Sequence, residues 1–103
     1  MAESQFRQDV EAIVARIPVG MVTTYGDVAA MAGHPYAARV VGGIAHFGNA
    51  ELPWQRVVNR FGGLASGYPG GRDSHAAHLQ SEGVSSTNHI VDRFEEIRWR
   101  PQV

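Results

Sequence analysis

The feature that most constrains the fold is a pair of short helical patterns separated by a tight turn. The residues "TYGD" at Thr24–Asp27 form a Thr-x-x-Asp variant of the capping box, and they predict a short helix that ends near Met31. A turn at Gly33-His34-Pro35 follows, and "YAARVVGGIAHF" then predicts a second helix that ends at Gly48-Asn49. Two helices joined by a glycine-containing turn are typical of a helix-turn-helix arrangement.

Short elements are expected on both sides of this pair. Apolar residues at helical spacing predict an amphipathic helix over Ser4–Arg16, which Pro18 and Gly20 terminate. After the pair, "RVVNRFGGLA" at 56–65 predicts a hairpin, or a short strand and a loop, and a glycine-rich loop follows. The chain therefore reads as mainly α with a small β element.

The last part of the chain carries weaker signals. Asp73 or Ser74 is expected to cap a final helix through Glu82, which Gly83 closes. From Ser85 onward the pattern is irregular, with a short strand expected at "HIV" and a turn near "FEEIRW". At 103 residues the whole chain is expected to be one domain, 1–103, without repeats or a linker.

Composition excludes several classes of protein. The chain contains no cysteine, so disulfides, cysteine metal sites and thiol nucleophiles are excluded, and the cytoplasm is the expected location. No apolar run approaches the ~20 residues of a membrane-spanning helix. A net charge of −1 argues against a generic basic nucleic-acid binder, yet between Val28 and Arg72 four arginines face one acid, a local excess of three positive charges. We therefore expect the middle of the chain to face an anion.

The second helix of the pair has an unusual outer face. Its predicted buried stripe consists of Ala37, Val40, Val41, Ile44 and Phe47, and the opposite stripe of Arg39, Gly42, Gly43 and His46. A glycine inside a helix costs roughly 1 kcal/mol relative to alanine. The two glycines are either tolerated at the surface or required because another backbone approaches closely, and a narrow DNA minor groove demands such a smooth face most. We favour contact over tolerance.

Five histidines raise the question of a metal site. His75 and His78 are three residues apart on one predicted helix, but no third ligand has a recognisable spacing. We interpret the pair as solvated surface residues and expect no metal.

Taken in order, five segments carry a resemblance to a known family: "IPVGMVTTYGDVA", "GHPYAARVVGGIA", "LPWQRVV", "GYPGG" and "LQSEGV". This series resembles the DNA-binding domain of the O6-alkylguanine-DNA alkyltransferases, and most of all their non-catalytic relatives, the alkyltransferase-like proteins. The resemblance covers a motif core at 6–84, and residues 85–103 form a C-terminal extension. It implies a winged helix-turn-helix-like DNA-binding domain.

The resemblance also points to a missing nucleophile. The family signature Pro-Cys-His-Arg-Val, whose cysteine accepts the alkyl group, reads here "PWQRV", with Trp54 at the acceptor position and Gln55 at the position of the base. An indole offers only an N–H donor and an amide does not titrate near neutral pH. Glu82 matches the family's orienting carboxylate but has no imidazole to orient. We therefore expect no enzymatic activity, and we expect Trp54 to form a pocket wall rather than to fill the core.

The resemblance implies roles for further residues. Arg39 matches an arginine that fills the gap left by a flipped base, and Tyr25 a tyrosine that rotates the 3′ phosphate and borders the lesion pocket. The groove-facing positions are Ala37, Ala38, Gly42 and Gly43, and the pocket positions are Tyr25, Trp54, Val57, Tyr68 and Pro69. Because Pro69 has no N–H, the pocket is expected to read the O6 atom less directly than in the transferases.

The implied function is recognition without repair. The expected partner is double-stranded DNA containing O6-alkylguanine, bound by a monomer without a cofactor or a membrane and then handed to nucleotide excision repair proteins. The main competing function is a sequence-specific helix-turn-helix transcription regulator, which would present base-reading polar side chains on its second helix. A hydrolase or transferase using Ser66 beside Glu82, and a purely structural module, are less well supported by the residues.

Overall fold

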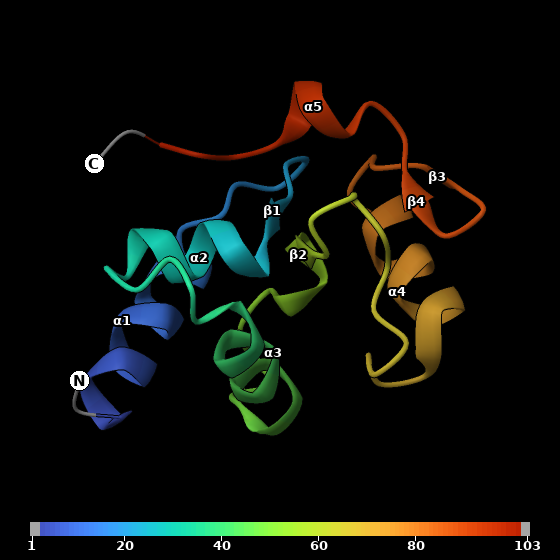
Figure 1. The fold of residues 1–103 in the computed structure, drawn as a ribbon. Helices are drawn as coiled ribbons and strands as arrows, with labels where there is room; N and C mark the ends of the chain where they lie inside the picture. Colours follow the sequence, from blue (N-terminus) through green and yellow to red (C-terminus); the bar gives the residue numbers. More distant parts are fainter. Residues whose placement is uncertain (1–2, 102–103) are drawn as a thin grey trace.

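In the computed structural model, which describes residues 3–101 and the side chains from residue 5 onward, the chain forms five short α-helices, one 3-10 helix and four two-residue strands (Figure 1). In chain order these elements are α1 (Glu3–Val14), β1 (Thr23–Thr24), α2 (Tyr25–Met31), α3 (Ala38–Phe47), η1 (Trp54–Arg56), β2 (Val57–Val58), α4 (Gly71–Gln80), β3 (Ser86–Thr87), β4 (Ile90–Val91) and α5 (Phe94–Ile97). The expected class, mainly helical with a small β element, is confirmed.

Helices α1, α2 and α3 pack around the first of two apolar clusters. The spacing of the N-terminal segment correctly predicts its buried face, which consists of Phe6, Val10, Ile13, Val14 and Ile17. Val28 and Ala29 of α2, Val41 and Ile44 of α3, and Trp54 and Val57 complete the cluster. Apolar burial of this kind is the main stabilising term in a small domain, so this cluster holds the helix pair in place.

The capping box predicted for α2 is present. The Thr24 hydroxyl accepts a hydrogen bond from the backbone N–H of Asp27 at 2.9 Å, and the Asp27 carboxylate accepts one from the N–H of Thr24 at 3.3 Å. Two helix N–H groups that would otherwise lack partners are thereby satisfied. Tyr25, the first residue of α2, is therefore attached to a well-defined helix start.

The buried stripe predicted for α3 is partly wrong. Val41 and Ile44 are buried, but Val40 is 44% exposed and Phe47 is 78% exposed. Helix α3 begins at Ala38 and presents a narrow stripe to α1 and α2, so residues at the edges of the predicted stripe lie at the surface. Sequence periodicity gives the centre of a buried face more reliably than its width.

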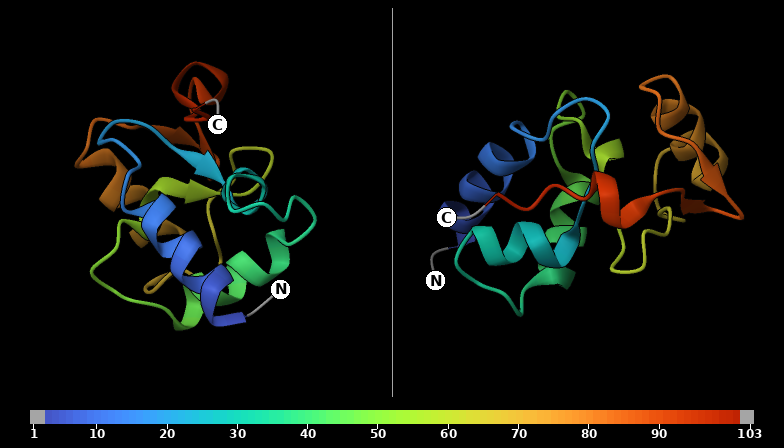
Figure 2. Two further views of the ribbon diagram at one scale, coloured as in Figure 1. Left: turned by 90° about the vertical axis from the view of Figure 1, so that its left-hand side faces the viewer. Right: turned by 90° about the horizontal axis from the view of Figure 1, so that it is seen from above.

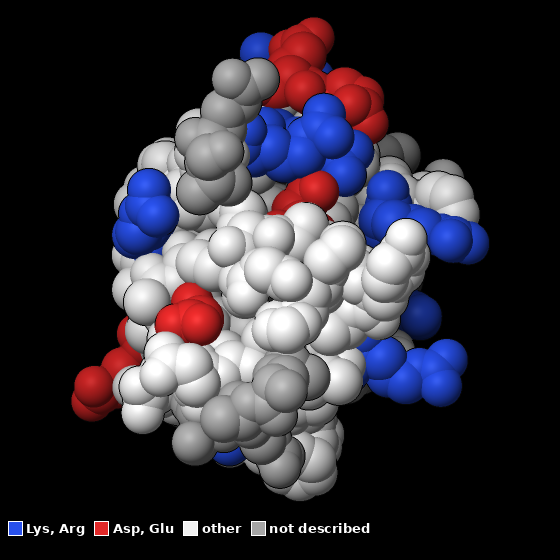
Figure 3. Space-filling view, turned by 60° about the vertical axis from the view of Figure 1, so that its left-hand side comes forward, with Lys and Arg blue, Asp and Glu red and all other residues white. Residues whose placement is uncertain are grey.

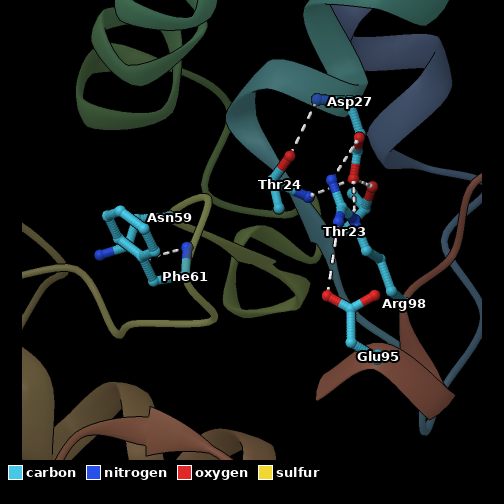
Figure 4. A network of polar contacts seen from close by, with 7 residues as sticks. All are labelled: Thr23, Thr24, Asp27, Asn59, Phe61, Glu95 and Arg98. Carbon is cyan, nitrogen blue, oxygen red and sulfur yellow. Dashed lines mark hydrogen bonds and ion pairs between the residues drawn. The ribbon is translucent and has the colours of Figure 1, made fainter.

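Of the two alternatives predicted for 56–65, a hairpin or a short strand and a loop, the structure shows the second. Strand β2 pairs in parallel with β1, Val57 opposite Thr23 and Val58 opposite Thr24. The Asn59 side chain then closes a turn, because its carbonyl oxygen accepts hydrogen bonds from the N–H groups of Phe61 at 2.9 Å and Gly63 at 2.8 Å (Figure 4). The turn directs the chain away from β2.

A second apolar cluster lies beyond this turn. It consists of Val22, Val58, Leu64, Leu79, Val84 and Val91, contributed by the β1–β2 pair, the loop before α4, α4 itself and the C-terminal hairpin. Strands β3 and β4 form that antiparallel hairpin, and Gly63 bridges to Ile90 at its edge. The hairpin and α4 thus stand together on the side of the molecule away from α1 (Figure 1).

Helix α4 begins earlier than predicted. Its first residue is Gly71, its N-cap is Gly70, and neither Asp73 nor Ser74 caps it. Gly70 and Gly71 have φ values of +87° and +82°, a left-handed conformation that glycine adopts without strain. The turn therefore depends on the backbone freedom of glycine rather than on a capping side chain.

The C-terminal extension returns to the helical side of the molecule. After α5, the chain runs across the β1–β2 pair towards α1 (Figures 1 and 2), and Arg98 forms a parallel bridge with Val22. The N–H of Val22 donates to the Ile97 carbonyl at 3.0 Å, and the N–H of Trp99 donates to the Val22 carbonyl at 2.6 Å. Residues 97–99, which we call the C-terminal strap, thus add a third extended segment beside β1.

An ion pair fastens the C-terminal strap to α2. The Arg98 guanidinium donates to both carboxylate oxygens of Asp27, at 2.9 and 3.0 Å, and the side chains are only 18% and 12% exposed (Figure 4). Burial raises the pKa of Asp27, but the hydrogen bonds from Arg98 and Thr24 outweigh it and hold the pKa below its ordinary value. One carboxylate therefore caps α2 and holds the end of the chain.

Candidate functional site

A cavity of about 510 Å³ lies between α3, the η1 segment and the loop that precedes α4. It is lined by Tyr25, Gly42, Ala45, His46, Gly48, Ala50, Leu52, Trp54, Gln55, Asn59, Leu64, Ala65, Ser66, Gly67, Tyr68, Pro69 and Arg72. The volume lies within the ~300–1,000 Å³ typical of small-molecule pockets. Elements from both halves of the chain therefore build one concave site.

The Trp54 side chain belongs to the apolar core and also lines the cavity. Its side chain is 9% exposed, packs in the first apolar cluster and lines the cavity. The indole N–H donates a hydrogen bond to the Asn49 carbonyl at 3.1 Å, which fixes the ring. Trp54 therefore lines the cavity, but the expectation that it does not fill the core is wrong.

Gln55, the next residue, is held by a buried ion pair. Glu82 accepts hydrogen bonds from Arg56 at 3.0 and 2.6 Å and from the Gln55 amide at 3.1 Å. Arg56 also donates to the Ile17 carbonyl at 2.8 Å. The hydrogen bonds from Arg56 hold the pKa of Glu82 below its ordinary value, so Glu82 is an ionised structural anchor rather than an available base.

His75 is the largest surprise in the site, since the sequence suggested a solvated residue and the structure shows a fully buried one. Its Nδ1 accepts a hydrogen bond from the Ala65 N–H at 3.0 Å, which places the proton on Nε2, and Nε2–H donates to the Gln55 carbonyl at 2.8 Å. Burial lowers the pKa of His75 and so favours this neutral form. The ring connects the η1 segment to the loop on the other side of the cavity.

Tyr68 covers this histidine. Its ring stacks on His75 with centroids 4.4 Å apart and an interplanar angle of 13°, and its hydroxyl lies 2.5 Å from Nδ1 of His78. Burial raises the pKa of Tyr68, so the side chain is a neutral phenol. Pro69 follows at the exposed edge of the cavity. Tyr68 and Pro69, two of the expected pocket positions, therefore both line the cavity.

Tyr25 and Val57 were both expected at the pocket, but only Tyr25 lines the cavity. Tyr25 lines the cavity from the start of α2, and burial raises the pKa of its hydroxyl. The Val57 side chain is fully buried in the first apolar cluster and does not line the cavity. Any part that Val57 plays in the pocket must therefore involve its backbone.

The outer face of α3 is open. A Cβ added to Gly42 or Gly43 would meet no atom within 4 Å, so packing within the protein does not explain either glycine. Arg39 is exposed and forms no hydrogen bond or ion pair with the residues that the structure describes, while Ala37 and Ala38 are half-buried beside it. Gly42 also lines the cavity, so the open helix face and the pocket are adjacent.

Sequence reasoning missed several lining residues. Ala65, Gly67 and Arg72 line the cavity; the glycine-rich composition of the 66–72 segment was a signal for Gly67, and the local excess of arginine between Val28 and Arg72 was one for Arg72. Ser66 also lines the cavity, but Glu82 is bound by Arg56 and Gln55 and is not available as its base. The structure thus gives no support to a serine hydrolase or transferase.

Figure 3 shows a largely uncharged area on one face of the molecule, with basic side chains at its left and right edges, acidic ones at the lower left, and acidic and basic side chains together at the top. Within residues 3–101 no helix is both long and apolar enough to cross a membrane, and the same residues contain no cluster of three or more histidines or carboxylates suited to a metal ion.

Comparison with known proteins agrees with this site. Residues 5–84 match the family described as "6-O-methylguanine DNA methyltransferase, DNA binding domain". The chain is 44% identical over 99 residues to a "DNA base-flipping protein" of Escherichia coli K12, covering 94% of this chain and 76% of that protein. It is 31% identical over 108 residues to "Alkyltransferase-like protein 1" of Schizosaccharomyces pombe, covering 98% of this chain and all of that protein.

Comparison with solved structures identifies proteins of the same family. The fold superposes with a TM-score of 0.84, at 30% identity over 98% of this chain and 100% of the other, on the S. pombe protein Atl1 in complex with damaged DNA containing O6-carboxymethylguanine. The Mycobacterium tuberculosis O6-methylguanine methyltransferase matches with a TM-score of 0.66 at 35% identity, over 75% of this chain and 47% of that one. The chain therefore belongs to the alkyltransferase-like proteins, within the family defined by the 6-O-methylguanine DNA methyltransferase DNA-binding domain.

Proposed function

We propose that the protein binds duplex DNA containing O6-alkylguanine, flips the altered base into the cavity and leaves the alkyl group in place. The observation that carries the proposal is the adjacency of the cavity to the open glycine face of α3. A helix without side-chain bulk at Gly42 and Gly43 allows a DNA backbone to approach closely, as minor-groove binding requires. The flipped base then enters the pocket that lies beside the same helix.

Arg39 fits the role of the residue that replaces the flipped base in the stack. It lies in the first turn of α3, is exposed, and is free of hydrogen bonds and ion pairs to the described residues. Its guanidinium is planar and always charged, so it can stack between bases and donate hydrogen bonds to the orphaned partner. Tyr25 lines the cavity from the start of α2, which is compatible with a contact to the DNA backbone beside the flipped base.

Transfer of the alkyl group lacks a nucleophile. The chain has no cysteine, and the Trp54 indole, at the position of the family's acceptor, is a donor only and is already bonded to Asn49. The two cavity tyrosines, Tyr25 and Tyr68, have raised pKa values and remain weakly nucleophilic phenols at neutral pH. Trp54 therefore provides an apolar wall against which a base can pack.

Binding without repair has a consequence only if another system removes the lesion. We therefore include nucleotide excision repair proteins, which excise the damaged strand segment, among the partners of the DNA complex. A major-groove regulator receives less support, because the exposed face of α3 presents Val40, Gly43 and Phe47 beside Arg39 and His46. Few of these side chains can hydrogen-bond to a base edge.

The experiment is a fluorescence-anisotropy titration at fixed salt with duplexes that differ only in one guanine: unmodified, O6-methyl or a larger O6-alkyl. We expect tighter binding to both modified duplexes than to the unmodified one. Arg39→Ala should reduce the affinity for modified duplexes by roughly tenfold or more, corresponding to ~1–3 kcal/mol. Arg93→Ala, which removes an exposed arginine paired with Glu96, serves as the control. Equal affinity for all three duplexes would refute the proposal.

A radiolabel experiment tests the absence of transfer. Protein in molar excess is incubated with duplex whose O6-methyl group is labelled, and protein and DNA are then separated under denaturing conditions. We expect all label on the DNA. Label bound covalently to the protein would show that another residue accepts the methyl group.

A further inference from the structure

The cavity contains a single permanently charged side chain. Among its lining residues Arg72 is the only lysine, arginine, aspartate or glutamate, so the fixed charge of the pocket is positive. The other lining residues are apolar, aromatic, amide, hydroxyl or imidazole groups. Arg72 is exposed to solvent, and it is the one permanently charged lining group that can favour a negatively charged ligand over a neutral one.

One hydrogen bond holds the Arg72 guanidinium, and no described carboxylate forms an ion pair with it. It lies in the first turn of α4, and its Nε donates a long hydrogen bond of 3.4 Å to the Leu64 carbonyl, on the loop that forms the cavity edge. Its two terminal nitrogens have no hydrogen-bond or ion-pair partner among residues 3–101. The guanidinium is therefore oriented by one weak contact while its terminal N–H groups remain available.

Two acidic side chains of the same part of the chain, Asp73 and Glu82, have other partners and form no ion pair with Arg72. Asp73, the next residue in α4, lies 3.1 Å from Nε2 of His89 and is 96% exposed. Glu82 is bound by Arg56 and Gln55. A carboxylate that enters the cavity with a ligand would thus meet no competing anion at Arg72.

We propose that Arg72 is a specificity-determining residue that favours O6-alkylguanines whose alkyl group ends in a carboxylate. This inference depends on the proposed function, because it assumes that the altered base enters the cavity. The guanidinium donates two parallel hydrogen bonds to a carboxylate, and such charge-assisted pairs are about twice as strong as neutral ones. A neutral amide of the same size offers one acceptor oxygen and no negative charge, so it gains at most one, weaker hydrogen bond.

The test compares two adducts of nearly equal shape, O6-carboxymethylguanine and its neutral amide O6-carbamoylmethylguanine, in the same duplex at fixed salt. Wild-type protein should bind the carboxylate adduct roughly tenfold more tightly, because charge-assisted hydrogen bonds are stronger than neutral ones, while the exposure of Arg72 to solvent limits the gain. Arg72→Gln, which keeps the length and helix propensity of the side chain, should remove that preference. Arg72→Lys should restore part of it.

The control variants distinguish a contact with the adduct from a contact with the DNA backbone. Arg60→Gln removes an exposed arginine that does not line the cavity, and it should weaken both adducts equally. If Arg72→Gln also weakens both adducts equally and lowers the salt dependence of binding, Arg72 contacts a DNA phosphate and the proposal is overturned. Equal wild-type affinity for the two adducts overturns it as well. Binding of O6-methylguanine over guanine, measured alongside, tests the proposed function separately.

Discussion

The Arg98–Asp27 ion pair makes a quantitative prediction about stability. Arg98→Ala removes two hydrogen bonds of 2.9 and 3.0 Å and leaves a carboxylate that is only 12% exposed. Removing one partner of a fully buried pair costs about 3–5 kcal/mol. Here the guanidinium retains 18% exposure and Thr23 and Thr24 still donate to Asp27, so we expect a loss of about 2–3 kcal/mol.

Urea unfolding followed by tryptophan fluorescence measures this loss, because Trp54 is buried and Trp99 is packed against the first apolar cluster. With an m-value of about 1–1.5 kcal/mol per molar urea for a domain of this size, the midpoint should fall by roughly 2 M. The matched control is Arg93→Ala, whose ion pair with Glu96 is exposed and should contribute less than about 0.5 kcal/mol.

The same pair predicts a pH dependence with a defined sign. The pKa of Asp27 is lowered in the folded protein, so its contribution is fully present above the ordinary aspartate pKa of ~3.9 and is lost as the pH falls through the lowered value. The gap between wild type and Arg98→Ala should therefore be constant from pH 5 to 7 and shrink below about pH 4. A midpoint shift for Arg98→Ala no larger than for Arg93→Ala, or a gap that does not respond to acid, would refute this reasoning.

Three further predictions concern the site. Gly42→Ala and Gly43→Ala should each stabilise the protein by up to ~1 kcal/mol, because the added methyl group meets no atom, yet weaken DNA binding; unchanged affinity in a titration would show that α3 does not approach DNA closely. His75→Ala should destabilise the protein by about 2–4 kcal/mol in urea, because it opens a cavity and leaves the Ala65 N–H and the Gln55 carbonyl without partners; a loss below 1 kcal/mol would contradict the bridging role. Trp54→Cys should still fail to accept a labelled methyl group, because Gln55 cannot deprotonate the thiol, and transfer at a rate well above that of free cysteine would show that another base is present.

Local signals in the sequence predicted the local elements well. The apolar spacing from Phe6 to Ile17 gave the buried face of α1, and the "TYGD" segment gave the capping box of α2, because both depend on residues within one or two turns. The turn between α2 and α3 was also predicted, because Gly33 allows the left-handed backbone found there and proline fixes φ. The open face at Gly42 and Gly43 followed from helical geometry alone.

Long-range features were not predictable in this way. His75 is buried because Ala65 and Gln55, ten and twenty residues away, supply partners for both ring nitrogens, and a single sequence carries no sign of that pairing. The parallel pairing of β2 with β1 brings together residues more than thirty positions apart. A two-residue strand is too short to reveal its partner by alternation.

The candidate site was predictable only in part. Trp54, Tyr68, Pro69 and Tyr25 were assigned from the family resemblance, and all four line the cavity. The position of Arg72 at the cavity was not predicted. It depends on the glycine turn before α4, and the sequence does not show in which direction that turn sends the chain.

The family match and the folded unit end at different residues, because the C-terminal strap lies beyond the match but is part of the fold. The family match ends at residue 84, yet Arg98 and Trp99 lie beside Val22 and complete the central extended segments. A fragment cut after Val84 would keep every residue of the candidate site and still lose the partner of the carboxylate that caps α2. Domain limits for expression or for grafting this pocket onto another scaffold should therefore follow the strap and include residue 99.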